Sequence, residues 1–381
     1  MRPIAMLQPH RLVFGQDCSG ECAPYLRRRG LQSAFVVTAP PTRFLAEKLA
    51  ASLRAEGLRA EVYDGIDTEP TVGMFQTALE AAKSAAPDAV IGLGGGSPLD
   101  VAKLVAAFLN SDQRVQDTFG IDLLAGRSTF LACLPTTAGT GSEVSPNAIL
   151  LDEAERLKKG VVSPYLVPDA TFVDPVLTVS MPPSVTAGTG LDALTHCIEA
   201  YTNKFAHPMI DLYALEGIRL IAGNLARAVA CGGDLEAREK VALGSMYGGL
   251  CLGPVNTAAV HALSYPLGGE FHVAHGISNS VLLPHVMEFN MEACAERSAE
   301  VAAALGASRE ADAMRMASAG VRRVREIAAE CGVPMNLNDL KIPRPAIPHM
   351  AEAAMRVTRL LKNNPRELTL PDAIAMYERA F

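Results

Sequence analysis

The first half of this 381-residue chain alternates short apolar runs with longer segments of helical periodicity, and no other feature limits its possible folds as strongly. The expected elements are strands at residues 34–38, 60–63, 89–93 and 129–134 and helices at residues 42–57, 70–86 and 98–110. Strands that alternate with helices favour a parallel sheet covered by its crossover helices. The first half is therefore predicted to be an α/β domain.

The pattern changes after Pro182 and Pro183, where the chain becomes rich in Ala and Leu with helical spacing. The helices expected there cover residues 192–202, 208–230, 234–252, 294–305 and 311–331. We place a domain boundary near residue 178. The chain is thus predicted to contain an α/β domain at residues 1–178 and an all-helical domain at residues 179–381.

Charge and cysteine content exclude several classes of partner. The net charge is −7 and there is no basic block, which argues against nucleic acid or an anionic membrane surface. No apolar run reaches the ~20 residues of a membrane span, and the N-terminus lacks the core of a signal peptide. The eight cysteines are scattered singly without a CxxC pair, as in reduced proteins. We expect a cytoplasmic protein.

A glycine-rich segment, GLGGGSPLD, follows the third expected strand and opens a helix. Gly95 and Gly96 would let the backbone approach a phosphate group, and Ser97 is a candidate helix cap before Pro98. The free N–H groups at the helix start favour an anion. The GxGxxG fingerprint is not met, because Ser97 stands where its last glycine would lie, and a plain tight turn is the alternative. A second loop, PTTAGTGSE, follows the next strand and is expected at the same edge of the sheet.

Three histidines and one aspartate form the candidate metal site. Asp192 and His196 are four residues apart, so one face of a helix would present both. His261 and His275 lie downstream among small residues, and Pro266 is expected to end the helix that carries His261. Each histidine alone is more often structural than a ligand. Together, three imidazoles and a carboxylate suit a divalent transition metal that leaves room for a substrate oxygen.

These residues stand within longer segments that resemble one family, the iron-containing (group III) alcohol dehydrogenases of the dehydroquinate synthase-like fold. The matching segments, in the family's order, are GGGSPLDVAK, PTTAGTGSEVSPNAI, KKGVVSPYLVPDATFVDP, TGLDALTHCIEAY, HALSYPLGGEFHVAHG and SNSVLLPHVMEFN. They cover much of the chain, so the resemblance is far more specific than the glycine turn alone. It implies an α/β dinucleotide-binding domain followed by a helical metal-binding domain.

The resemblance also implies roles for single residues. It implies metal ligands at Asp192, His196, His261 and His275. It implies pyrophosphate contacts from Gly95, Gly96 and Ser97, and a dinucleotide site lined by Asp100, Thr136, Thr137, Thr140 and Lys158. It implies substrate contacts from Asn147 and Leu252.

The chain departs from the family pattern at two positions. The family often has a second histidine four residues after His261, where this chain has Tyr265, so a proton relay falls to Tyr265 or to His272. Many members carry an aspartate after the first strand, which binds the adenine ribose, where this chain has Ala39. Without that carboxylate, the repulsion against the 2′-phosphate of NADP is lost.

We expect an NAD(P)-dependent alcohol dehydrogenase or aldehyde reductase that uses one divalent metal, Fe²⁺ or alternatively Zn²⁺, as a Lewis acid. Its partner would be a small alcohol or aldehyde, and the family suggests a homodimer or higher homo-oligomer. The second reading is a hydroxyacid–oxoacid transhydrogenase that retains its cofactor. A lyase or synthase on the same fold would need Lys and Arg near the metal, which residues 192–201 and 261–275 lack. A non-catalytic nucleotide-binding homologue would not need the four metal ligands.

Overall fold

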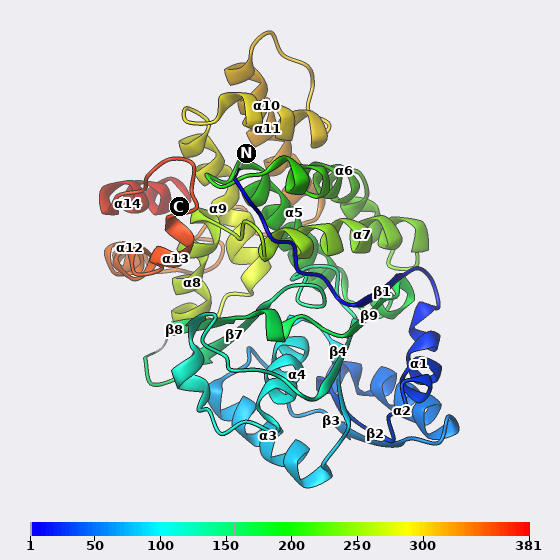
Figure 1. Cartoon of the computed structure of the whole chain (residues 1–381). Helices are drawn as coiled ribbons and strands as arrows, with labels where there is room; N and C mark the ends of the chain where they lie inside the picture. Colours follow the sequence, from blue (N-terminus) through cyan, green and yellow to red (C-terminus); the bar gives the residue numbers. More distant parts are fainter. Residues whose placement is uncertain (1, 156) are drawn as a thin grey trace. The chain divides into compact units, whose positions relative to one another are not determined.

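The computed structural model describes residues 2–155 and 157–381, which divide into two compact units (Figure 1). The sheet unit comprises Met6–Thr137 and Gly141–Ser180. The helical unit comprises residues 2–5, Ala138–Thr140 and Met181–Phe381. Three residues of the PTTAGTGSE loop therefore group with the helices that follow later in the chain.

The sheet unit is built on a six-stranded sheet in which every pair of neighbours is parallel, with the order β1-β9-β6-β4-β2-β3. Its strands are β1 (Arg11–Phe14), β2 (Ser33–Val37), β3 (Arg59–Tyr63), β4 (Ala89–Gly94), β6 (Phe130–Pro135) and β9 (Ala170–Val173). The helices around it are α1 (Cys22–Arg28), α2 (Arg43–Ala55), α3 (Val72–Ala85) and α4 (Gly96–Phe108). The order changes direction beside β4, so the carboxyl end of β4 is where a ligand crevice is expected in such sheets.

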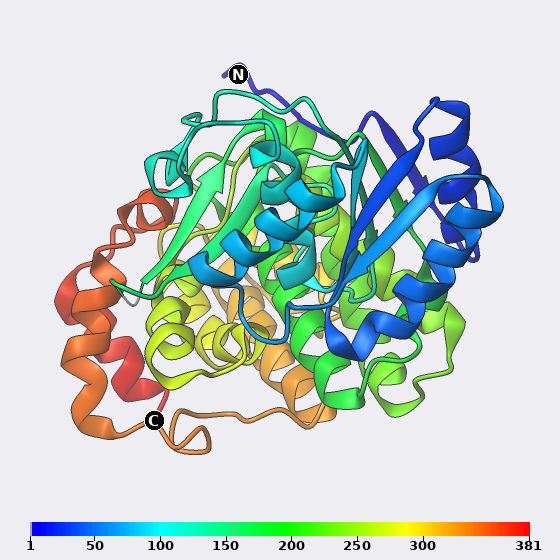
Figure 2. The same ribbon diagram turned by 90° about the horizontal axis from the view of Figure 1, so that it is seen from below.

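Both faces of this sheet are buried, which explains why its strands read as continuous apolar runs. Phe35 and Val37 pack in one core with side chains of α3 and α4. Ala34 and Val36 point to the other face, where α1 and α2 complete a second core. Figure 2 shows the two helix pairs on either side of the strands. A smaller sheet of β5 (Gly120–Ile121), β8 (Leu157–Val162) and β7 (Asn147–Asp152) was not predicted from the sequence.

The helical unit is formed by ten α-helices among the described residues. They are α5 (Pro183–Thr202), α6 (Pro208–Ala230), α7 (Leu235–Leu252), α8 (Ala259–Phe271), α9 (His275–Asn290), α10 (Ala295–Ala304), α11 (Ala313–Glu330), α12 (Ile347–Met355), α13 (Thr358–Leu361) and α14 (Leu370–Arg379). Helix α5 is buried along most of its length and packs against α6, α7 and α9. This central position places its polar residues in the interior of the unit. An α/β unit followed by an all-helical unit is the predicted fold class.

Two local predictions were wrong. Pro266 does not end the helix that carries His261, because α8 continues to Phe271. The helix is buried around Pro266, and packing outweighs the one backbone hydrogen bond that a proline removes. The chain turns instead at His272, which has a left-handed backbone (φ 55°) and donates its N–H to the Leu267 carbonyl. Ser97 is not the helix cap, since α4 already begins at Gly96.

No helix among the described residues is long and apolar enough to cross a membrane.

Candidate functional site

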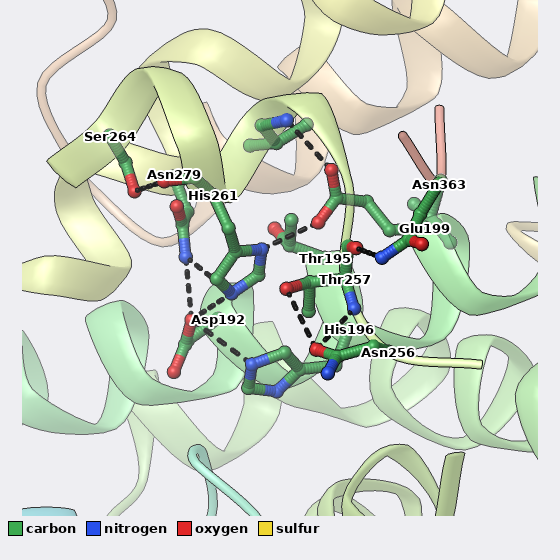
Figure 3. Close-up of polar contacts among 12 residues, drawn as sticks. Asp192, Thr195, His196, Glu199, Asn256, Thr257, His261, Ser264, Asn279 and Asn363 are labelled. Carbon is green, nitrogen blue, oxygen red and sulfur yellow. Dashed lines mark hydrogen bonds and ion pairs between the residues drawn. The ribbon is translucent and has the colours of Figure 1, made fainter. Parts of the chain in front are cut away.

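Three histidine side chains of the helical unit converge on the carboxylate of Asp192, and Figure 3 shows Asp192, His196 and His261. Asp192 and His196 lie one turn apart on α5, while His261 is near the start of α8 and His275 begins α9. The Nε2 atoms of His196, His261 and His275 lie 3.8, 3.6 and 3.6 Å from Asp192 Oδ1. The ligand atoms of Asp192, His261 and His275 all lie within 4.8 Å of one another. The structure brings the four residues together.

This arrangement fits a divalent metal ion. Ligand atoms bound at about 2.1 Å in a tetrahedron lie about 3.4 Å apart, and the separations of 3.6–3.8 Å around Asp192 Oδ1 are close to that value. Imidazole nitrogen and carboxylate oxygen are donors that Fe²⁺ and Zn²⁺ both accept. The side chain of His275 is 30% exposed while that of Asp192 is 4% exposed, so the group is reached from the His275 side.

The electrostatics of the group favour the ionised carboxylate of Asp192 and the neutral ring of His196, whereas they favour the protonated ring of His261. Burial raises the pKa of Asp192, but His196 and His275 outweigh that effect and hold its pKa far below the usual range. Burial lowers the pKa of His196, which favours the neutral ring. Burial would also lower the pKa of His261, yet Glu199 and Asp192 together raise it to about 9. Metal binding requires the carboxylate and a free imidazole nitrogen, so it displaces protons from the group.

Sequence reasoning missed two buried residues that contact the ligands. Glu199 Oε2 lies 2.5 Å from His261 Nδ1. The amide of Asn279 donates to Asp192 Oδ1 at 2.7 Å, and its Nδ2 lies 3.2 and 3.3 Å from the Nε2 atoms of His261 and His275. Helical spacing could have indicated both, because Glu199 is seven residues after Asp192 and Asn279 is four after His275.

The two candidate proton-relay residues differ in their surroundings. Tyr265 is 8% exposed, and its ring centroid lies 6.3 Å from that of His275. His272 is exposed at the left-handed turn between α8 and α9. Only Tyr265 is therefore packed beside a candidate metal ligand.

In the sheet unit, the glycine segment lies where β4 ends and α4 begins. Gly95 is the N-cap residue, and the N–H groups at the start of a helix have no acceptor within it. Gly94 has a φ of 154°, and an added Cβ would come within 2.7 Å of Pro98. An added Cβ at Gly95 would meet the Thr137 methyl at 3.2 Å. The turn thus leaves little room for a side chain at Gly94 or Gly95 and lies at a helix N-terminus, a position that suits a phosphate group.

The PTTAGTGSE loop lies beside this turn at its first residues. Thr136 donates its N–H to the Gly94 carbonyl at 2.8 Å, and Thr137 contacts Gly95 as described above. Thr140 belongs to the three residues that group with the helical unit. In that unit, an added Cβ on Gly139 would come within 2.7 Å of Thr189 on α5. The sheet unit thus joins Thr136 and Thr137 to the glycine turn.

Asp100 is held by the protein itself. Its carboxylate accepts a hydrogen bond from the Ser142 hydroxyl and one from the Ile149 N–H at 2.9 Å. Lys103, one turn along α4 and fully buried, donates to the carbonyls of Ser142 and Ser145, both at 2.9 Å. Burial raises the pKa of Asp100 and lowers that of Lys103, while their mutual attraction opposes both shifts. This buried network fixes the loop that follows β6.

The remaining predicted residues are spread over both units. Lys158 on β8 forms an ion pair with Glu69. Asn147 begins β7, and its Oδ1 has no hydrogen-bond partner within the described part of the chain. Leu252 is the buried last residue of α7 in the helical unit.

Ala39 lies just after β2, where its carbonyl accepts the Thr42 N–H at 3.0 Å. The Thr38 and Thr42 hydroxyls are 2.9 Å apart. The nearby Arg43 is engaged with two carboxylates, Asp64 at 2.8 Å and Glu47 at 3.2 Å. Any anion near Ala39 therefore competes with Asp64 and Glu47 for the guanidinium.

Comparisons with known proteins give one consistent result. Residues 9–175 match the family model described as iron-containing alcohol dehydrogenase, and residues 186–381 match the model of the family's C-terminal part. The long-chain-alcohol dehydrogenase 1 of Geobacillus thermodenitrificans (strain NG80-2) is 40% identical over 385 residues, which cover 97% of this chain and 96% of the relative.

Two solved structures extend the likeness to the fold. A crystal structure of 1,3-propanediol oxidoreductase is 31% identical with a TM-score of 0.96, and 100% of both chains is covered. The sulfoacetaldehyde reductase of Bifidobacterium kashiwanohense, solved with NAD⁺, is 28% identical with a TM-score of 0.90, covering 100% of this chain and 99% of that one. The resemblance stated from the sequence motifs is thereby confirmed: the chain belongs to the family of iron-containing alcohol dehydrogenases.

Proposed function

We propose that this protein interconverts a primary alcohol and its aldehyde, with NAD(P) as hydride acceptor or donor and one divalent metal, Fe²⁺ before Zn²⁺. The observation that carries the proposal is the set of three imidazole Nε2 atoms at 3.6–3.8 Å from one carboxylate oxygen in a chain of this family. When bound, the ion supplies Lewis acidity, which makes an alcohol proton easier to remove. Asp192, His196, His261 and His275 would hold it.

We propose that the proton released from the alcohol leaves through Tyr265 or His272. Tyr265 is supported by its place beside His275, and His272 by its exposure at the end of α8. An imidazole can both accept and donate a proton, so an exposed His272 is suited to exchange the proton with water. Tyr265 would contribute a hydroxyl on the inner side of that path.

For the dinucleotide, we propose that Gly95, Gly96 and Ser97 bind the pyrophosphate. Replacing Gly96 with valine puts a branched side chain at the first residue of α4, where the phosphate must approach the backbone. We expect NADH affinity to fall at least about tenfold, or roughly 1.4 kcal/mol, in a fluorescence titration.

Gly126→Val is the matched control for this change. It lies in the same unit, and an added Cβ there meets nothing within 4 Å. It should bind NADH like the wild type. Wild-type affinity in Gly96→Val itself would refute the assignment of the turn.

We propose that NADPH is accepted, because Ala39 lacks the carboxylate that would repel a 2′-phosphate. Ala39→Asp should shift the ratio of kcat/KM values toward NADH by about 1–3 kcal/mol, the range for a hydrogen bond to a charged group. Ala39→Asn has nearly the same size without the charge and should shift the ratio much less.

The kcat/KM values of the wild type with NADH and NADPH already test the proposed acceptance of NADPH. If the wild type discriminates against NADPH by several orders of magnitude, another group supplies the ribose contact. Asp64, which is paired with Arg43 after the adjacent strand β3, would then be the first residue to replace.

The proposed substrate class is a small or medium-length alcohol, with Leu252 and Asn147 as contacts. It is supported by the names of two relatives, a long-chain-alcohol dehydrogenase and a 1,3-propanediol oxidoreductase. The test is a panel of primary alcohols, diols and aldehydes assayed with NADH and NADPH on protein reconstituted with Fe²⁺ or Zn²⁺. Absence of turnover with every member and either metal would refute the proposal.

We further propose that residues 1–178 bind the dinucleotide and residues 179–381 bind metal and substrate. The matched family regions, which meet between residues 175 and 186, support this division. A cytoplasmic location and assembly into a homodimer or higher homo-oligomer are part of the same proposal. Size-exclusion chromatography with light scattering tests the assembly.

A further inference from the structure

Glu199 is a buried acid on α5 whose carboxylate contacts a backbone N–H and a histidine ring. It is 4% exposed, and it follows His196 by three residues on the same helix. Both of its carboxylate oxygens reach the start of α8. Oε1 accepts the Val260 N–H at 2.7 Å, and Oε2 lies 2.5 Å from His261 Nδ1 (Figure 3). Both oxygens of this buried carboxylate therefore contact consecutive residues of another helix, Val260 and His261.

The bond to His261 determines which ring nitrogen carries the proton. A carboxylate only accepts hydrogen bonds, so Nδ1 must be the donor. In the neutral ring the Nε2 atom is then left with its lone pair, and this atom lies 3.6 Å from Asp192 Oδ1. A metal ion needs that lone pair. Glu199 therefore selects the tautomer that can bind metal, as carboxylates do behind many metal-bound histidines.

The bond to Val260 fixes the helix that carries the ring. The N-cap residue of α8 is Ala258, which has no side chain to accept a hydrogen bond from the first turn. Glu199 takes over that role from α5, and its negative charge lies at the positive end of the α8 dipole. The start of α8 and the orientation of His261 thus depend on the same group.

We propose that Glu199 is a positioning residue of the metal centre, which holds α8 by the Val260 N–H and presents His261 Nε2 to the metal. The inference rests on the proposed function, since it assumes that the four ligands bind an ion. Glu199 touches neither that ion nor a substrate in this arrangement. Its effect passes through Val260 and His261.

The Glu199→Gln variant tests the proposal, because it keeps the shape and one acceptor oxygen. That oxygen still accepts the Val260 N–H, so the side-chain NH₂ faces His261 Nδ1. The ring must then carry its proton on Nε2, the atom required by the metal. We expect affinity for Zn²⁺ or Fe²⁺, measured by competition with a chromogenic chelator, to fall about 10–100-fold.

A spectroscopic measurement reads the tautomer directly. In Zn²⁺-loaded wild type, long-range ¹H–¹⁵N spectra of the histidines should show a protonated Nδ1 for His261, and Glu199→Gln should lose this signal. The Glu288→Gln variant is the matched control, because Glu288 lies on α9 and pairs with Arg325 at 2.9 Å. It should bind metal like the wild type.

A second variant separates metal positioning from simple stabilisation of α8. Adding Ala258→Ser to Glu199→Gln supplies a local cap for the helix without restoring the bond to His261. Glutamine keeps the bond to Val260 but removes the negative charge at the start of α8, so we expect the resulting small loss of melting temperature in the metal-free protein to recover in the double variant while metal affinity stays low. Recovery of both would show that Glu199 acts only through helix stability, and unchanged affinity in Glu199→Gln would overturn the proposal. If the wild type itself binds no metal, the proposed function fails instead.

Discussion

Replacing His261 with alanine should abolish metal binding and nearly all turnover. The side chain offers one of four ligand atoms, and its ring stacks on that of His196 with centroids 4.8 Å apart. We expect metal content, measured by inductively coupled plasma mass spectrometry after gel filtration, to fall to about a tenth of the wild-type value or less. Because a Lewis acid supplies several kcal/mol to such reactions and 1.36 kcal/mol is a factor of ten, kcat/KM should fall by about three orders of magnitude.

His349→Ala is the matched control for this experiment. His349 lies in the same unit, 63% exposed and 3.3 Å from Glu270, away from the four ligands. It should retain both metal and activity. The assignment would be wrong if His261→Ala kept full metal content together with wild-type turnover, with circular dichroism showing an intact fold in both variants.

Lys103→Met should cause a large loss of stability in the sheet unit. The Lys103 ammonium is fully buried and donates to Ser142 and Ser145, and its charge offsets that of Asp100. Methionine fills similar space but leaves Asp100 without its cation and the carbonyls of Ser142, Ser145 and Asn147 without this donor. Breaking a buried charge pair from one side costs about 3–5 kcal/mol, so the free energy of unfolding in urea should fall by that amount.

Two further variants serve as a control and as a test of the buried charge. Lys83→Met removes an exposed lysine of α3 in the same unit and should change stability by less than about 0.5 kcal/mol. Adding Asp100→Asn to Lys103→Met removes the uncompensated acid and should return part of the loss. If Lys103→Met were as stable as Lys83→Met, the buried network would not anchor the loop.

The sequence was sufficient for the elements whose local signals agree with their tertiary surroundings. Strands β2 and β4 are apolar on both faces because helices cover both faces, so their runs were readable without a structure. Helix α6 was predicted with its observed bounds, since Pro208 begins it and a break in periodicity follows Ala230. The remaining part of the fold class came from the resemblance, because six motifs occur along the chain in the order found in the family.

Other features depend on contacts that sequence spacing does not reveal. The stop signal at Pro266 was overridden by burial of α8 on its neighbours. Arg43 lies four residues after Ala39, and only the β2–β3 pairing shows that Asp64 lies next to it. Lys103 carried no signal at all, because its partners are backbone carbonyls about forty residues away.

In the candidate metal site, too, some features could be predicted from sequence spacing and others depend on tertiary contacts. Asp192 and His196 are joined by helical spacing, so their pairing could be predicted, whereas His261 and His275 come together only through the α8–α9 packing. Glu199 and Asn279 also have helical spacing from a ligand, yet glutamate and asparagine on a helix are so common that spacing alone does not single them out. Their burial and short contacts identify them.

The left-handed turn at His272 has a consequence for attempts to make this protein more stable. An L-residue in that conformation carries a cost of about 1–2 kcal/mol that glycine avoids. A design procedure guided by backbone preference would therefore choose His272→Gly, and the substitution should raise the melting temperature. The same change removes an exposed imidazole from the segment that joins His261 to His275. Under the proposed role of His272 in proton exchange, stability and turnover are in conflict at this position, so a variant selected for heat resistance should be checked there first for lost turnover.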